Sequence, residues 1–251
     1  EAKISVFDSA VMLGDTVTES TRTFAHRLFK LDDHIKRLYR SLKITRINPG
    51  MTPDEMTALS LRVLDANRHL LGPGDDCWLV HNISRGQSVA GADPTVQRSP
   101  ATIIVFTQPM ILSDWARFYV EGCHAVTPMS RATPSQALDA RIKNRSRMAY
   151  TLAEIEVKLV DPQAQSVLLD IHGNIAENKG GNFFVVSDGD RADGAVLGQD
   201  EPGSVPVDLW VGCRTMPPGS FAARLPSHRR KLHHPQVHVG CREVRGRGCQ
   251  R

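Results

Sequence analysis

The hydrophobic pattern of this chain ends abruptly near residue 187. Before that point, apolar residues recur at helical or strand spacing. Residues 188–251 instead hold nine Gly, six Pro, nine Arg and three Cys, and no regular pattern persists there beyond Val205–Val211. Such a segment cannot bury enough apolar surface to offset the entropy lost when it becomes ordered. We therefore expect residues 188–251 to be an atypical tail, non-native or disordered, and the folded part to precede it.

The excess positive charge of the chain also belongs to this tail. The formal net charge is +4, yet Arg214–Arg251 holds nine Lys and Arg against one acidic residue, Glu243. Residues 1–213 therefore carry a net charge of −4. Because aromatic residues do not alternate with the arginines, the tail offers no stacking platform for a single-stranded nucleic acid. We expect neither nucleic acid nor a membrane as a partner.

Cysteine usage and hydropathy place the chain in a broad class. Its five cysteines are an odd number, they form no CxxC pair, and no secretory signal opens the sequence. A disulfide framework is therefore not expected, and the reducing cytoplasm is the predicted location. No apolar run approaches the roughly 20 residues that a membrane-spanning helix needs.

The first 71 residues predict strands followed by two helices. Alternating apolar residues predict strands at Ile4–Asp8 and Thr18–Phe24. A helix is predicted from Leu31 to Leu42, because two acidic residues suit the positive end of its dipole and apolar residues follow at helical spacing. A second helix is predicted from Thr52 to Leu71, since it opens with a capping box and ends at a Gly-Pro-Gly turn.

The remaining elements suggest two domains. Strands are predicted at Cys77–Ser84, Thr102–Thr107, Phe118–Val126, Ser166–Ile171 and Asn182–Ser187, and a helix is predicted at Met148–Val160. That helix places Met148, Leu152, Ile155 and Leu159 on one apolar face.

Two prolines and a lack of periodicity mark an irregular segment between the predicted domains. We predict an N-terminal α/β domain at 1–125, a linker at 126–140, and the start of a second domain at 141–187.

Two charged residues stand out, Lys143 just after this linker and Glu177 in a Gly-rich turn. Lys143 lies between two arginines, a setting typical of a solvated surface cation. Glu177 lies between two predicted strands, a setting typical of a turn residue. Each signal is weak by itself.

Together with other motifs, the two residues fall into an ordered set of three blocks. The first comprises Ile4-Ser-Val-Phe-Asp8, Gly14-Asp15 and Glu19. The second is Phe29-Lys-Leu-Asp-Asp-His-Ile-Lys-Arg-Leu38. The third comprises Ile142-Lys143, Leu168–Asp170, Gly173 and Glu177-x4-Asn182-x-Phe184. In residue type, order and spacing, the chain resembles the class IV (fold-type IV) pyridoxal-phosphate aminotransferases over about residues 2–187. That family includes branched-chain and D-amino-acid transaminases, (R)-selective amine transaminases and aminodeoxychorismate lyases.

The resemblance implies roles for three residues. Lys143 matches the lysine that bonds covalently to pyridoxal 5'-phosphate and then moves a proton between substrate and cofactor. Glu177 matches the cofactor-binding carboxylate that keeps the pyridine nitrogen protonated. Arg37 matches the arginine that binds the cofactor phosphate. No metal ligand is assigned.

Two further residues bear on the substrate. Arg85, in Ile83-Ser-Arg-Gly86, is similar to the arginine that binds the substrate carboxylate in the D-amino-acid branch, although an ordinary arginine at a strand end fits nearly as well. Tyr150 follows Lys143 at seven positions, whereas the branched-chain pattern has five. This spacing departs from the branched-chain enzymes.

The tail departs from the family more strongly. Family members continue with a G-I-T-R helix start and a Thr/Ser-rich turn that holds the cofactor phosphate, and nothing from Asp188 onward resembles either. We hypothesise that a shifted reading frame or a foreign segment begins after about Val186.

The resemblance implies an α/β (α+β) fold, with a small N-terminal α/β domain and an incomplete barrel-like α/β C-terminal domain. It implies a homodimer that transfers an amino group from an amino acid or amine to a 2-oxo acid, as the branched-chain enzymes do. Carbon–carbon cleavage of the aminodeoxychorismate lyase type is one alternative. A truncated, inactive remnant or simple binding protein is another.

Overall fold

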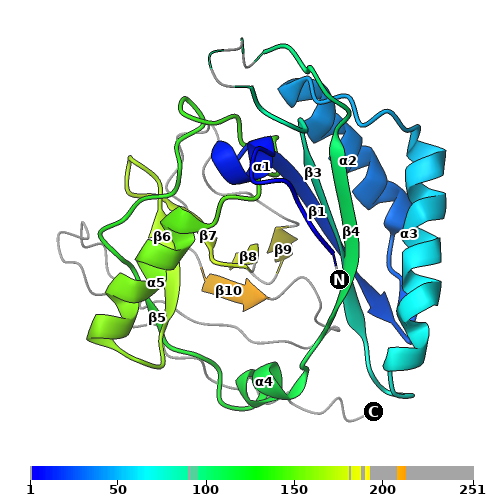
Figure 1. Cartoon of the computed structure of the whole chain (residues 1–251). Helices are drawn as coiled ribbons and strands as arrows, with labels where there is room; N and C mark the ends of the chain where they lie inside the picture. The colour runs from blue at the N-terminus through cyan, green and yellow to red at the C-terminus, as the bar shows by residue number, and fades with distance from the viewer. Residues whose placement is uncertain are drawn as a thin grey trace. The chain divides into compact units, whose positions relative to one another are not determined.

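The fold is described from a computed structural model. It describes residues 2–89, 91, 93 and 95–180, and the backbone of three strands at 182–187, 190–192 and 208–212. This part of the chain forms two compact units, and Figure 1 labels most of their helices and strands. Unit 1 comprises Glu1–Ile111 and Leu138–Ser146. Unit 2 comprises Leu112–Ala137 and the described residues from Arg147 onward.

Unit 1 is built on an antiparallel sheet with the strand order β2-β1-β3-β4. The bounds are β1 Thr16–Phe24, β2 Arg27–Leu28, β3 Cys77–Ser84 and β4 Thr102–Pro109. The strands predicted at Thr18–Phe24, Cys77–Ser84 and Thr102–Thr107 are therefore confirmed. Glu19 of β1 stands opposite His81 of β3 in the register, so these two polar residues meet in the middle of the sheet.

The predicted strand at Ile4–Asp8 is wrong. A turn leads instead into a short helix, α1, at Ser9–Met12, and Asp8 caps that helix by accepting the N–H of Ala10 over 2.8 Å. The same carboxylate accepts the hydroxyls of Ser84 and Thr102. Asp8 therefore joins the start of α1 to the ends of two strands, a long-range use that the alternation of apolar residues did not reveal.

Two helices pack on this sheet and confirm the predicted pair. They are α2 at Leu31–Thr45 and α3 at Pro53–Asn67, followed by the one-turn helix η1 at Arg68–Leu70. α3 begins with the predicted capping box, in which Thr52 and Glu55 satisfy each other's backbone N–H. The core of unit 1 forms where the apolar face of α2 meets the sheet and α3, and includes Val17, Ile35, Leu38, Leu42, Met56 and Ile83.

Unit 2 contains three helices and a small mixed sheet in its described part. The helices are α4 Ser113–Ala116, the one-turn η2 Arg117–Tyr119 and α5 Met148–Val160. The sheet has the order β5-β6-β7, with bounds β5 Ala125–Val126, β6 Gln165–Leu169 and β7 Ile175–Asn178. β5 and β6 are parallel, whereas β6 and β7 are antiparallel.

The strand predicted at Phe118–Val126 is only partly correct. Its first residues lie in η2, and Gly122 adopts a positive φ of 72°, which interrupts extended backbone. Only Ala125–Val126 pairs as a strand. The predicted helix at Met148–Val160 and the strands at 166–171 and 182–187 are confirmed, the first strand within a residue or two.

α5 buries a different face from the predicted one. Its buried residues are Ala153, Glu154 and Val157, and Glu154 accepts both the N–H and the hydroxyl of Ser166. The predicted apolar face is exposed, with exposed fractions of 73% for Met148, 51% for Leu152, 54% for Ile155 and 84% for Leu159. Apolar residues occupy two faces of this helix, and the face with the small Ala153 allows the closer approach to β6.

A second sheet has the order β10-β8-β9, with bounds β8 Asn182–Ser187, β9 Asp190–Ala192 and β10 Asp208–Gly212. The last two strands fall within the predicted tail, and the rest of residues 188–251 lies outside the described residues. The predicted domain boundaries stay predictions. Residues 138–146, which the sequence divides between the linker and the second domain, belong to unit 1.

Candidate active site

Lys143 belongs to a short segment of unit 1, residues 138–146, which we call the lysine strap. The N–H of Lys143 donates to the hydroxyl of Ser41 over 3.1 Å, and its carbonyl accepts the N–H of Thr18 over 2.8 Å. Ile142 packs against the core of unit 1. The backbone of Lys143 is therefore fixed between β1 and α2, which is not a typical setting for a solvated surface cation.

A local turn prepares the strap for this position. Asp139 accepts the N–H of Arg141 and also pairs with its guanidinium, and its carbonyl accepts the N–H of Ile142. Farther along, Asn144 bridges Val17 in antiparallel fashion and Arg145 donates its N–H to Thr16 over 3.0 Å. The strap thus lies along β1 like a short extra strand.

Arg37 lies one helical turn before Ser41 on α2. Residues four apart on a helix share a face, so Arg37 and the hydroxyl that holds Lys143 lie on the same face of α2. The structure therefore brings two of the predicted site residues, Lys143 and Arg37, to one region of unit 1.

The guanidinium of Arg37 forms a two-point ion pair with Glu19 of β1. Its Nε donates to Oε2 over 2.6 Å and its Nη2 donates to Oε1 over 2.5 Å. The Arg37 side chain is 27% exposed, whereas that of Glu19 is fully buried. The sequence assigned Glu19 to a family motif but gave it no role.

Glu19 is charged despite its burial. Its Oε1 also lies 3.1 Å from Nδ1 of His34 and accepts the N–H of Ser20. Burial by itself raises the pKa of Glu19, but the hydrogen bonds from Arg37 and His34 outweigh it and lower the pKa to about 2. His34 thus supports the same carboxylate as Arg37.

His81 lies beside this carboxylate and is neutral. Burial lowers the pKa of His81 to about 4, against the attraction of Glu19. Its Nε2 lies 2.8 Å from the hydroxyl of Ser60, which donates its own hydrogen to the carbonyl of Met56. Because that hydroxyl hydrogen is already used, the His81 Nε2–H is the donor of the pair.

Glu177 lies in β7 of unit 2, and its register partner in β6 is Leu168. Burial, reinforced by a hydrogen bond with the Glu177 carboxylate, raises the pKa of Tyr150 well above its ordinary value. The guanidinium of Arg147 lies 4.7 Å from the centre of the Tyr150 ring. In the sequence, Tyr150 was noted only for its unusual spacing from Lys143, and nothing local indicated that it would contact Glu177.

Arg85 is occupied by contacts within unit 1. Its Nε donates to Asp15 over 2.8 Å, and its two Nη atoms donate to the carbonyls of Arg46 and Thr45. These carbonyls end α2, where the helix dipole favours a cation. The contacts favour the simpler of the two readings of Arg85, that of a structural arginine.

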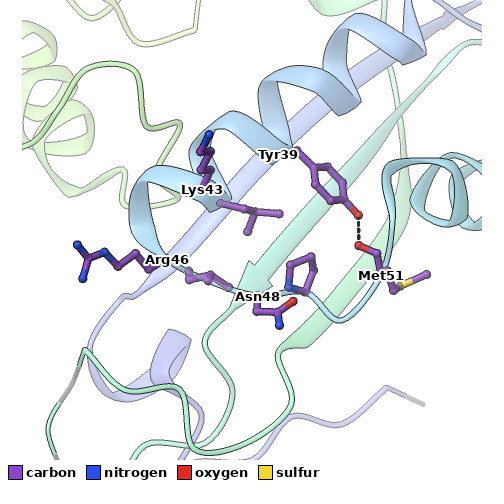
Figure 2. A pocket seen from close by; sticks show the side chains of 8 residues that line it. Tyr39, Lys43, Arg46, Asn48 and Met51 are labelled. Atoms are coloured by element: carbon purple, nitrogen blue, oxygen red, sulfur yellow. Dashed lines mark hydrogen bonds between the residues drawn. The ribbon is translucent and has the colours of Figure 1, made fainter.

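A hollow on unit 1 lies at the C-terminal end of α2 and measures about 380 Å³. Figure 2 shows Tyr39, Lys43, Arg46, Asn48 and Met51 around it, with the Tyr39 hydroxyl bonded to the Met51 carbonyl over 2.8 Å. It is open to solvent, and none of the predicted site residues lines it. We therefore place the candidate active site at Lys143 and Arg37.

Comparison with known proteins decides the family. The model of the family "Amino-transferase class IV" matches residues 16–191, which include Lys143, Arg37 and Glu177. The chain belongs to this family. The resemblance recognised in the sequence is confirmed.

The chain is also similar to curated relatives. A Methanocaldococcus jannaschii protein provisionally named a branched-chain-amino-acid aminotransferase is 30% identical over 190 residues, which cover 75% of this chain and 62% of the relative. Branched-chain-amino-acid aminotransferase-like protein 1 of Arabidopsis thaliana is 30% identical over 192 residues, covering 75% of this chain and 33% of the relative. The chain thus spans less than two thirds of the length of these relatives.

Solved structures confirm the α/β fold of fold-type IV aminotransferases. A T.th. branched-chain amino acid aminotransferase, complexed with N-(5'-phosphopyridoxyl)-L-glutamate, matches with a TM-score of 0.65 and 26% identity. The match covers 76% of this chain and 62% of that structure. Within the described part of the chain, no helix is both long and apolar enough to cross a membrane.

Proposed function

We propose that the chain is a pyridoxal-phosphate-dependent aminotransferase that moves an amino group between an amino acid and a 2-oxo acid. The observation that carries the proposal is the hydrogen bond between Lys143 and Ser41, because it ties the lysine to the helix that presents Arg37. Membership in the class IV aminotransferase family supports the same activity.

The residues of unit 1 fit this cofactor chemically. A phosphorylated aldehyde needs an amine that can bond to its carbonyl carbon and a cation that can bind its phosphate. Lys143 supplies the amine and Arg37 supplies a fork of N–H donors suited to phosphate oxygens. We propose Glu177, from unit 2, as the carboxylate for the pyridine nitrogen.

Each residue then has a distinct task. When bound, pyridoxal phosphate supplies an electron sink for the bonds at the substrate's α-carbon. Lys143 holds the cofactor, and its released amine carries the α-proton. Arg37 anchors the phosphate, and Glu177 holds a proton on the ring nitrogen. Tyr150, whose pKa the Glu177 carboxylate raises, would orient that carboxylate.

For the substrate, we propose a branched-chain amino acid and its 2-oxo acid, because both relatives described above carry branched-chain names. The spacing of Tyr150 differs from the branched-chain pattern, so the substrate pocket differs in detail from those enzymes. The contacts of Arg85 leave it as a weak candidate for the substrate carboxylate. A homodimer in the cytoplasm completes the proposal.

Half-reactions test the proposal. The protein is titrated with pyridoxal phosphate, and the absorbance of the bound cofactor is followed after addition of L-leucine, a D-amino acid or an (R)-amine. We expect binding and conversion to the pyridoxamine form with L-leucine. Binding without conversion by any donor would instead support a simple binding protein. Absence of binding would contradict the proposed function.

A further inference from the structure

The ion pair between Glu19 and Arg37 occupies only one edge of the guanidinium. Glu19 accepts from Nε and Nη2, whereas Nη1 makes no hydrogen bond to any residue in the described part of the chain. A guanidinium presents its five N–H groups in one plane. Fixing the Nε–Nη2 edge therefore fixes the direction in which the remaining donors point.

Glu19 is itself rigidly held. Its carboxylate is fully buried in β1 and accepts from Arg37, from the Ser20 N–H and, when His34 carries a hydrogen on Nδ1, from that ring. Arg37 and His34 lie three residues apart on α2 and reach the same carboxylate from one face of that helix. A side chain with this many partners is a fixed reference point, whereas an arginine that is 27% exposed would otherwise sample several rotamers.

From this geometry we propose that Glu19 is a positioning residue for phosphate recognition. It holds the plane of Arg37 so that the free donors of the guanidinium meet the phosphate of the cofactor. The inference rests on the proposed function, because it takes Arg37 as the phosphate anchor. It adds to that function an acidic residue that strengthens the binding of an anion.

The sign of this effect separates positioning from simple charge balance. If Glu19 only neutralised Arg37, its removal would leave the site more positive, and the phosphate would bind more tightly. If Glu19 positions Arg37, its removal frees the guanidinium to rotate, and the phosphate binds more weakly. The two roles therefore predict opposite changes from one substitution.

The test measures dissociation constants of pyridoxal phosphate and of pyridoxal, which lacks the phosphate, for the wild-type protein and Glu19→Gln. We expect Glu19→Gln to weaken the binding of pyridoxal phosphate by about tenfold, which corresponds to the loss of one charge-assisted hydrogen bond. The affinity for pyridoxal should stay unchanged. Glu55→Gln serves as a matched control, since it makes the same change at an exposed carboxylate in the capping box of α3. Equal or tighter binding of pyridoxal phosphate by Glu19→Gln would overturn the proposal.

Glu19→Asp keeps the test decisive if the buried glutamine prevents folding. It retains the negative charge but withdraws the carboxylate by one methylene. If Glu19 positions Arg37, Glu19→Asp should weaken the binding of pyridoxal phosphate and leave the binding of pyridoxal unchanged. If Glu19 only balances charge, neither affinity should change, and this result would overturn the proposal.

A double-mutant cycle with Arg37→Lys completes the experiment. Lysine keeps the charge but has no planar set of donors for Glu19 to orient. In the Arg37→Lys background, Glu19→Gln should therefore weaken the binding of pyridoxal phosphate by less than about twofold. A full tenfold loss in the Arg37→Lys background would also overturn the positioning role. Failure of the proposed function looks different, because wild type would then not bind pyridoxal phosphate, or Arg37→Lys would leave its affinity unchanged.

Discussion

The hydroxyl of Ser41 accepts the backbone N–H of Lys143 over 3.1 Å, across 102 positions of the sequence. The same hydroxyl lies 3.4 Å from the carbonyl of Arg141, to which it donates. One small, buried side chain on α2 therefore satisfies two backbone groups of the lysine strap. The position of Lys143 depends on the helix that carries Arg37, and this dependence leads to the first prediction.

Ser41→Ala should loosen the strap without breaking the core. It removes the partner of two backbone groups, and we expect the free energy of unfolding to fall by about 1–3 kcal/mol. The affinity for pyridoxal phosphate should fall with it. Thr45→Ala is the matched control, because the Thr45 hydroxyl bonds only to carbonyls of its own helix. Equal effects of the two substitutions in urea titrations would contradict this role of Ser41.

Lys143→Ala should abolish the visible absorption band of the lysine-bound cofactor, because no amine remains at that position to bond to the aldehyde. Absorbance spectra after addition of pyridoxal phosphate measure the effect. Lys36→Ala is the control, since this α2 lysine side chain is 76% exposed. A normal band in Lys143→Ala would rule out the assignment of this lysine.

His81 makes the stability of unit 1 depend on pH. Its pKa is about 4 in the folded protein and 6.5 ordinarily, so the unfolded chain binds more protons between these values. Stability from this group is complete above pH 6.5 and is lost as the pH falls toward 4, by about 3 kcal/mol in total.

Urea titrations between pH 7 and pH 4.5 measure this slope. Over that range Glu19 contributes little, because its stabilisation is lost only below its ordinary pKa of 4.5. His81→Gln should flatten the profile, whereas His172→Gln, which alters an exposed residue, should not. An unchanged slope in His81→Gln would show that other groups cause it.

Glu177→Gln should lower the pKa of Tyr150. Burial raises this pKa first, and the Glu177 carboxylate raises it further, so loss of the carboxylate charge removes only the second contribution. Ultraviolet difference titration measures tyrosine ionisation directly, with Tyr150→Phe identifying the transition. Glu154→Gln, in which the changed carboxylate bonds to Ser166, is the control. An identical Tyr150 transition in wild type and Glu177→Gln would contradict the contact.

The coding DNA tests the origin of the tail. The family match ends at residue 191, close to Val186, after which we hypothesise a change of frame or a foreign segment. We expect another reading frame after that codon to encode a G-I-T-R-like segment. If neither of the other two frames does so, the frameshift hypothesis is wrong.

Local patterns in the sequence were sufficient for most of the elements. The capping box at Thr52 and the helical spacing after Leu31 predicted α3 and α2, because caps and periodicity act over a few residues. The position of Gly122 was not used, and the strand expected across it was therefore too long. In α5, two apolar faces competed, and periodicity could not tell which one the sheet would cover.

The sequence named the residues of the candidate site, whose roles stay predictions, but not the residues that support them. Lys143, Glu177 and Arg37 came from family motifs, which record residue type and order. Ser41 and His81 carry no motif, since their roles arise only when distant segments meet. Glu19 lay within a motif, yet its pairing with Arg37 required the packing of α2 on β1. Arg85 matched a family pattern, but its donors are directed at the end of α2.

Unit 1 is formed from two separate stretches of the chain, and this affects the order in which its parts are synthesised. Its four strands and its helices α1, α2 and α3 all precede residue 112, whereas the lysine strap follows at residues 138–146. At roughly 5–20 residues per second, the ribosome takes about 1–5 seconds to make the intervening residues 112–137. During that interval the partners that Ser41 and Thr18 have in the folded structure are not yet synthesised. Lys143, to which we assign the proposed chemistry, therefore lies in the part of unit 1 that is synthesised last.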